Sequence, residues 1–157
     1  MPILKIITIP NPILRKKSKE INFKEINTRD FAKLVSAMGK TMIKTDGAGL
    51  AAPQIGKSIR LAVINSKDGP ICLINPKITR KSWARELGQE GCLSIPGIFG
   101  QVKRHKKITV AYYNQAGKKI KQVAQGLMAR VMQHEIDHLD GILFIDKMAG
   151  KKIKQHE

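Results

Sequence analysis

The stretch QHEIDHLDG, residues 133–141, places two histidines four positions apart near the end of an apolar-patterned segment. Gly141 stands where a helix would end. On a helix, His134 and His138 are about 40° apart, so both imidazoles can reach one point. We therefore predict a helix over residues 126–140 that presents two histidines together. Its apolar face is formed by Leu127, Met128, Val131, Met132 and Ile136.

The spacing His-Glu-x-x-His on a helix is typical of a metal site, with two imidazole ligands and a carboxylate, here Glu135, to handle protons. Taken alone, the pattern also fits a solvated polar helix face. A catalytic metal needs a third protein ligand and one open position. The candidates after His138 are few, and position 144 is Phe144, so the extended spacing with a third downstream histidine is absent. The downstream candidates are Asp140, Asp146, His156 and Glu157. Because none of them completes the familiar spacing, the third ligand is expected upstream.

Cys92 is the upstream candidate, in the stretch EGCLSIPG (90–97), which we interpret as a glycine-bounded loop. A thiolate is a good ligand for zinc or iron, and a Cys-His-His set leaves one position for water. The second cysteine, Cys72, lies in the apolar run PICLINP and is expected in the core. A disulfide between them is not expected in a reducing compartment.

The remaining chain alternates between helical and strand patterns. An amphipathic helix is predicted over 27–46, opened by a capping Asn27 or Thr28. Strands are predicted over 59–65 and 70–79, and a hairpin over 108–114 and 118–125. This order favours an α+β fold, with small antiparallel or mixed sheets packed around the central helix that carries the histidines. The length of 157 residues fits a single domain over 1–157.

Composition bounds the location and the partners. No run is long enough to span a membrane, and the N-terminal segment lacks the order of a secretory signal, so a cytoplasmic protein is expected. The net charge of +17 points to a polyanionic neighbour such as nucleic acid, a ribosome surface or anionic lipid, although it also fits a compositional bias. Aromatic residues make up only 4% of the chain, which argues against a base-stacking surface. The basic clusters are RKKSK (15–19), KRHKK (103–107), KKIK (118–121) and KKIK (151–154).

Three segments together resemble the motifs of the peptide deformylase family of bacterial type. They are GAGLAAPQIG (47–56), EGCLS (90–94) and QHEIDHLDG (133–141), and they occur in the family's order. The resemblance implies a metal-dependent hydrolase that removes the N-formyl group from the N-terminal methionine of new polypeptides and releases formate. The first motif varies at Ala48, where bulkier aliphatic residues are also common, so the shape of the side-chain pocket stays open.

The resemblance also implies the roles of the central residues. Cys92, His134 and His138 would hold the metal. Glu135 would take a proton from water and return it to the leaving amine. Gln54 and the backbone N–H of Leu93 would donate hydrogen bonds to the oxygen of the tetrahedral intermediate.

Residues of the substrate site are expected in three places. The extended segment Gly47, Ala48 and Gly49 could pair with the peptide backbone as an added strand. Leu127 and Val131 could line an apolar pocket for methionine, or could be plain core residues. A further residue, Arg104, is similar to an arginine that family members place near the peptide backbone, although a solvated basic run is an equal alternative.

The family resemblance favours Fe(II) in the cell as the single divalent metal, with Zn(II), Ni(II) or Co(II) able to replace it. The expected partners are N-formylmethionyl peptides on nascent chains and a ribosome surface reached through the basic patches. No membrane contact is expected, and the protein is expected to be a monomer.

Two rival functions remain open from the residues. One is a zinc endopeptidase, against which the absent downstream ligand and the short chain count. The other is a basic RNA- or ribosome-binding protein with a structural zinc. A structural site should have four protein ligands, and only three good ones are found.

Overall fold

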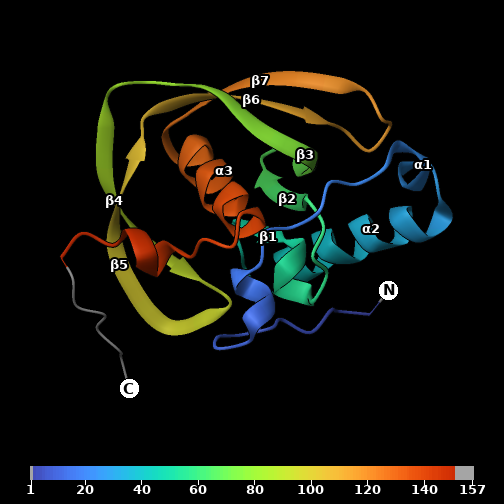
Figure 1. Ribbon diagram of the computed structural model, residues 1–157, viewed down its shortest axis with the longest axis horizontal. Coiled ribbons are helices and arrows are strands. Elements are labelled where there is room, and N and C mark those ends of the chain that lie inside the picture. The colour runs from blue at the N-terminus through green and yellow to red at the C-terminus, as the bar shows by residue number, and fades with distance from the viewer. Residues whose placement is uncertain (1, 151–157) are drawn as a thin grey trace.

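A computed structural model describes residues 2–150 of the chain, and it shows two antiparallel β-sheets beside two main helices (Figure 1). The larger sheet has five strands in the order β1-β2-β3-β6-β7, and β4 and β5 form a separate hairpin. The predicted α+β class is confirmed, and every pairing between the named strands is antiparallel. The strands are β1 Gly49–Ala51, β2 Leu61–Ser66, β3 Gly69–Lys81, β4 Arg85–Cys92, β5 Ile95–His105, β6 Lys107–Tyr113 and β7 Lys119–Gln125. The helices are α1 Phe23–Ile26, α2 Arg29–Lys44 and α3 Gly126–Leu139, with 3-10 turns at Pro12–Arg15, Ala52–Ile55 and Phe144–Lys147.

Helix α2 confirms the amphipathic helix predicted from the sequence. Thr28 caps its N-terminus, where the side-chain oxygen accepts a hydrogen bond from the Phe31 N–H at 3.2 Å. Its apolar face is buried against β1 and β2, and each fully buried side chain of this size contributes roughly 1.5–3 kcal/mol. The buried residues at helical spacing are Phe31, Val35, Met38 and Met42.

Helix α3 runs through the middle of the molecule, with the hairpin on one side and the larger sheet on the other (Figure 1). One side of it, with Ala129, Met132 and Ile136, packs on the inner face of the sheet. Gly141 follows its end with a φ of 74°, and a Cβ there would overlap the Arg15 carbonyl oxygen. Glycine is therefore required at the point where the chain leaves this helix.

The predicted strands occur with their ends shifted by at most two residues, and β6 and β7 form the predicted hairpin. The hairpin of β4 and β5 was not predicted. Its first strand, RELGQEGC, is charged and glycine-containing, and most of its side chains are exposed, so it lacks the apolar alternation of a half-buried strand. Cys92 is consequently the last residue of a strand, and the interpretation of a glycine-bounded loop was wrong.

Cys72 lies in β3, half-buried, and packs against the core formed by α2 and β2, as expected for a core cysteine. No helix within residues 2–150 is long and apolar enough to cross a membrane. The predicted basic cluster at 151–154, together with His156 and Glu157, lies outside the described residues.

Candidate metal centre and active site

The two histidines of α3 and the cysteine of β4 meet at one point. The ring centroids of His134 and His138 are 5.0 Å apart, and Cys92 Sγ lies 3.3 Å from His138 Nε2. The ligand atoms of the three residues all lie within 4.8 Å of one another. The structure thus brings together the three metal ligands that the sequence predicts, from segments more than forty residues apart.

Hydrogen bonds orient these side chains for a metal. His134 donates from Nδ1 to Glu90 Oε1 at 2.9 Å, because a carboxylate can only accept, and this leaves its Nε2 facing the other ligands. The opposite ring nitrogen of His138, Nδ1, is buried and has no hydrogen-bond partner among the described residues. One soft thiolate and two imidazoles are a donor set that suits zinc or iron. The residues present therefore fit a divalent metal.

The two histidines differ in ionisation. Burial, with the nearby His134, lowers the pKa of His138 well below its usual range, so its imidazole is neutral. Burial also lowers the pKa of His134, but hydrogen bonds to Cys92 and Glu90 outweigh this and raise it to about 10. A metal held here takes the place of the His134 proton, so metal uptake is coupled to proton release.

Glu135 lies beside this centre and points toward β1. Its side chain is only 3% exposed, and its Oε2 has no hydrogen-bond partner among the described residues. A Cβ on Gly49 would lie 2.7 Å from Glu135 Oε1, so the glycine makes room for the carboxyl group. Burial raises the pKa of Glu135 to about 7, which places the group between its acid and base forms near neutral pH.

Gln54 is held in place from both ends of its amide. Its Oε1 accepts a hydrogen bond from the Ala51 N–H at 2.9 Å, and its Nε2 donates to Ser94 Oγ at 3.1 Å. The same nitrogen lies 3.5 Å from Cys92 Sγ. The 3-10 turn over Ala52–Ile55 therefore places the amide nitrogen of Gln54 between Ser94 and Cys92, beside the candidate metal centre.

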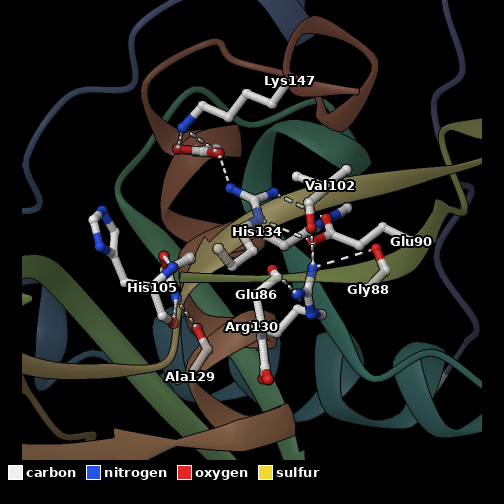
Figure 2. A network of polar contacts seen from close by, with 12 residues as sticks. Glu86, Gly88, Glu90, Val102, His105, Ala129, Arg130, His134 and Lys147 are labelled. Atoms are coloured by element: carbon white, nitrogen blue, oxygen red, sulfur yellow. Dashed lines mark hydrogen bonds and ion pairs between the residues drawn. The ribbon is translucent and has the colours of Figure 1, made fainter. Parts of the chain in front are cut away.

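Glu90 is the organising residue that the sequence analysis missed. It accepts two hydrogen bonds from Arg104, at 2.9 Å each, one from Arg130 at 2.7 Å and one from His134 (Figure 2). Burial opposes its ionisation, yet the hydrogen bonds from Arg104 and His134 lower the pKa of Glu90 to about 2. Glu90 thus stays ionised and fixes the orientation of the His134 ring.

Arg130 was missed as well, although it links α3 to the hairpin. Figure 2 shows its guanidinium reaching the carbonyl oxygens of Glu86, at 2.9 Å, and Val102, at 2.9 Å. A Cβ on Gly88 would lie 2.7 Å from the guanidinium carbon, so glycine permits this approach. A basic residue on an apolar-patterned helix was the only signal in the sequence, and it does not reveal which backbone it binds.

A cavity of about 470 Å³ opens in front of the metal centre. All of the predicted site residues except Arg104 either line this cavity or belong to the candidate metal centre behind it. Leu127 is 75% exposed and lies at its edge, so it is not a core residue. Predicted residues that line it are Gly47, Ala48, Gly49, Gln54, Cys92, Leu93, Leu127, Val131, His134 and Glu135.

Arg104 is the predicted substrate residue that the structure does not bring to the cavity. Its side chain is 3% exposed, and its nitrogens are occupied by Glu90 and by Asp137, at 2.6 Å. Asp137 is bound in turn by Lys147. Arg104 therefore lies behind the metal centre as part of an ion-pair network, because a guanidinium this deep in the fold needs carboxylate partners.

Comparison with known proteins finds similarity over nearly the whole chain. Residues 3–154 match the polypeptide deformylase family. A peptide deformylase of Desulforudis audaxviator is 45% identical over 148 residues, which is 94% of each chain. One from Carboxydothermus hydrogenoformans is 49% identical over 147 residues, again 94% of each chain.

Solved structures of similar proteins share the fold. The peptide deformylase of Thermotoga maritima superposes with a TM-score of 0.91 at 39% identity, covering 96% of this chain and 100% of the other. The Synechococcus elongatus enzyme in complex with actinonin superposes with a TM-score of 0.90 at 40% identity, covering 96% of this chain and 81% of the other.

Proposed function

The chain belongs to the polypeptide deformylase family, and from this premise we propose how its own residues carry out the reaction. Members of the family are metal-dependent hydrolases, and this protein removes the N-formyl group from new polypeptides. We infer that Cys92, His134 and His138 hold the metal. The observation that supports this most directly is the convergence of their three ligand atoms beside the buried Glu135.

A divalent metal bound by these residues would supply Lewis acidity that polarises the formyl carbonyl and makes water more acidic. Glu135 accepts a proton from the attacking water and then gives it to the amine as the C–N bond breaks. The second proton of the water also passes to the amine when the acid leaves as formate, so formate and a protonated N-terminal amine are the products and atoms and protons balance. The pKa of about 7 for Glu135 allows the same group to act as base and then as acid.

Charge that develops on the carbonyl oxygen is stabilised by hydrogen-bond donors held in place before the reaction. We assign this role to the Gln54 amide N–H that faces Cys92 and to the backbone N–H of Leu93. The hydrogen bonds that Gln54 makes with Ala51 and Ser94 reduce the cost of orienting it during the reaction.

The substrate is proposed to lie along the cavity, with its methionine side chain between Leu127 and Val131 on α3. Gly47, Ala48 and Gly49 border the same cavity, and this segment could pair with the peptide backbone as an added strand. Arg104 is left out of the substrate site because its side chain is enclosed by Glu90 and Asp137.

The cellular setting is also a proposal. Fe(II) beside a thiolate suits a reducing cytoplasm, and we propose Fe(II) as the cellular metal, with Zn(II), Ni(II) or Co(II) as replacements. Anaerobic purification followed by metal analysis tests this.

We further propose that residues 1–157 form a single catalytic domain that acts as a monomer. We also propose that its basic surface contacts the ribosome, and the net charge of +17 supports this contact.

The experiment that tests the function compares two peptides that differ only in the N-terminal blocking group. Metal-loaded protein should release formate from a formyl-Met peptide and leave the acetyl-Met peptide almost unchanged. Cleavage of internal peptide bonds instead would favour the zinc endopeptidase, and binding without hydrolysis would favour a non-catalytic zinc protein.

A further inference from the structure

Trp83 is the only tryptophan of the chain, and its side chain is 97% exposed. Tryptophan is among the residues that are most buried on average, so this exposure is unusual. The residue lies in the short turn between β3 and β4, away from the catalytic cavity, whose lining does not include it. The deformylase reaction therefore does not account for it.

Hydrogen bonds fix the backbone of this turn. The Ser82 N–H donates to the Lys107 carbonyl at 2.8 Å, and the Lys106 N–H donates to the Ala84 carbonyl at 3.0 Å. The His105 ring also contacts the Ser82 carbonyl, 2.7 Å from its Nδ1. The indole is thus presented from a backbone pinned on both sides of Trp83.

Five exposed basic residues lie within three positions of Trp83 in the chain or on the segment whose backbone is hydrogen-bonded to its turn. Within residues 2–150, none of them takes part in an ion pair, although the exposed Glu86 follows Arg85 in the chain. Two of them belong to the KRHKK cluster (103–107) noted in the sequence. In β3, the register of pairing shifts between Ile78 and Arg80, so the side chains of this strand do not alternate regularly between its two faces there. The cations are Arg80, Lys81, Arg85, Lys106 and Lys107.

A groove of about 570 Å³ continues this surface from β3 toward α3. Lys77, Arg80 and Lys81 form one wall, and Lys147 lies at the other side. Its acidic residues are neutralised, since Asp140 is bound by Arg60 at 2.9 Å, and Asp137 by Arg104 and Lys147. The groove is therefore positively charged overall.

The groove and the catalytic cavity lie on opposite sides of α3. Gln133 and Asp140 face the groove, whereas Val131 and Glu135 face the cavity. At 100° per residue these two pairs are about half a turn apart around the helix. A molecule bound in the groove would leave the mouth of the catalytic cavity open.

We propose that Trp83 and this groove, with the cations around them, form a binding surface for single-stranded RNA. The cations would contact phosphates along the backbone, and the indole would stack on one base. The choice of RNA over single-stranded DNA rests on the proposed function, because formylated chains are made on an RNA-rich particle. A single stacking residue is compatible with the aromatic content of 4%.

Other polyanions fit this surface less well. An acidic protein segment would satisfy the cations but offers no planar ring to the indole. A lipid bilayer would need further apolar side chains beside Trp83, and the exposed neighbours at positions 80, 81 and 85 are charged. A nucleotide chain carries both phosphates and π-faces, so it uses both features at once.

Tryptophan fluorescence, excited at a wavelength that the two tyrosines do not absorb, reports the proposed site alone, because Trp83 is the only tryptophan of the chain. Titration at low salt with a single-stranded oligoribonucleotide of about eight nucleotides, a typical length for such a site, should quench this fluorescence. The apparent affinity should fall steeply with added salt. Inorganic polyphosphate and polyglutamate should bind at least roughly tenfold more weakly and quench little. Absence of quenching by RNA, or equal quenching by polyglutamate, would overturn the proposal.

Variants separate stacking from charge, with affinity measured by the anisotropy of labelled RNA. Trp83→Leu should weaken binding roughly tenfold, the scale of a lost base stack. Charge reversal of Arg80 and Lys81 to Glu should weaken it further. The matched control is the same reversal at Lys33 and Lys40, which are exposed on α2, and it should have a much smaller effect.

Formyl-peptide hydrolysis is measured on the same variants, so that a loss of RNA binding can be distinguished from a loss of the hydrolase activity. None of the substituted residues lines the catalytic cavity, so the rates should be unchanged. RNA binding lost with hydrolysis intact would confirm a separate surface. If the α2 control lowered the affinity for RNA equally, binding would depend only on the net charge of the protein, and the proposed site would be wrong.

Discussion

The two cysteines of this chain have different surroundings and should respond differently to the same substitution. Cys92 contacts His138, whereas Cys72 packs against the α2 core, where burial raises the pKa of its thiol to about 12. Cys92→Ser should lose most of the bound metal, because a hydroxyl is far less acidic than a thiol. Metal content per chain, measured by atomic spectroscopy, checks this.

Cys72→Ser is the control for that substitution. It should keep the metal content of the parent and lose only some stability, since a hydroxyl would replace an apolar contact in the core. Metal near one equivalent in Cys92→Ser would remove this cysteine from the ligand set.

Glu90 should make the stability of the protein sensitive to acid. Although burial alone would raise the pKa of Glu90, its bonds to Arg104 and His134 lower it from 4.5 to about 2 in the folded state. A lowered pKa means that this stabilisation is complete above about pH 4.5 and is lost as the pH falls toward 2. Urea unfolding measured from pH 5 to pH 2 should therefore show a falling free energy of unfolding.

Glu90→Gln should flatten that pH dependence, because the titrating group is gone. It should also lower stability at neutral pH by about 3–5 kcal/mol, since Arg104 is left buried without one of its charge partners. An identical acid response in the parent and the variant would show that Glu90 is not the group responsible.

At the scale of elements, β1 and α3 are matched to each other through Gly49. A Cβ at this position would come within 2.7 Å of Glu135 Oε1, so Gly49→Ala must displace either the short strand or the Glu135 carboxyl group. We expect a large loss of kcat and a lower Tm, with the metal retained because its ligands lie elsewhere. Steady-state kinetics and thermal unfolding measure both effects.

Gly39→Ala provides a matched control within α2. A Cβ there meets only ordinary contacts, the nearest being Pro70 at 3.5 Å. Alanine is about 1 kcal/mol more favourable than glycine inside a helix, so this variant should be slightly more stable and fully active. Equal activity loss in both variants would mean that the effect of Gly49 is not local to Glu135.

The elements that could be predicted from the sequence are those whose burial follows a period. Helices α2 and α3 and strands β3, β6 and β7 bury apolar residues at a recurring spacing, and β2 is a short apolar run that is buried on both faces. The hairpin of β4 and β5 carries exposed charged residues, and its glycines serve close approaches such as that of Arg130 to Gly88. Local patterns cannot reveal contacts of this kind.

In the site, too, some residues could be predicted from the sequence and others are revealed only by the packing. The three residues that meet at the candidate metal centre could be proposed because His134 and His138 have a fixed helical spacing and because the three motifs resemble a known family. Arg104 was expected at the substrate, and only the three-dimensional packing shows that Glu90 and Asp137 enclose it. A long-range ion-pair network leaves no periodic signal in a sequence.

For the whole molecule, the charge of +17 predicts a salt-sensitive association with the ribosome. The terminal KKIK cluster lies outside the described residues, and removal of 151–157 should weaken this association while sparing hydrolysis of a short formyl-peptide. Sedimentation with ribosomes over a range of salt concentrations measures the effect. Unchanged affinity at low salt would show that this segment makes no contribution.

The central claim is that Glu135 moves protons beside a metal that it does not hold. Glu135→Gln keeps the side-chain volume and removes the base, and formate release and metal content are measured on the same sample. The account predicts near-stoichiometric metal and a rate lower by roughly 10²–10⁴ or more, the scale of a lost general acid or base. Activity within a few-fold of the parent, or loss of metal together with activity, would contradict it.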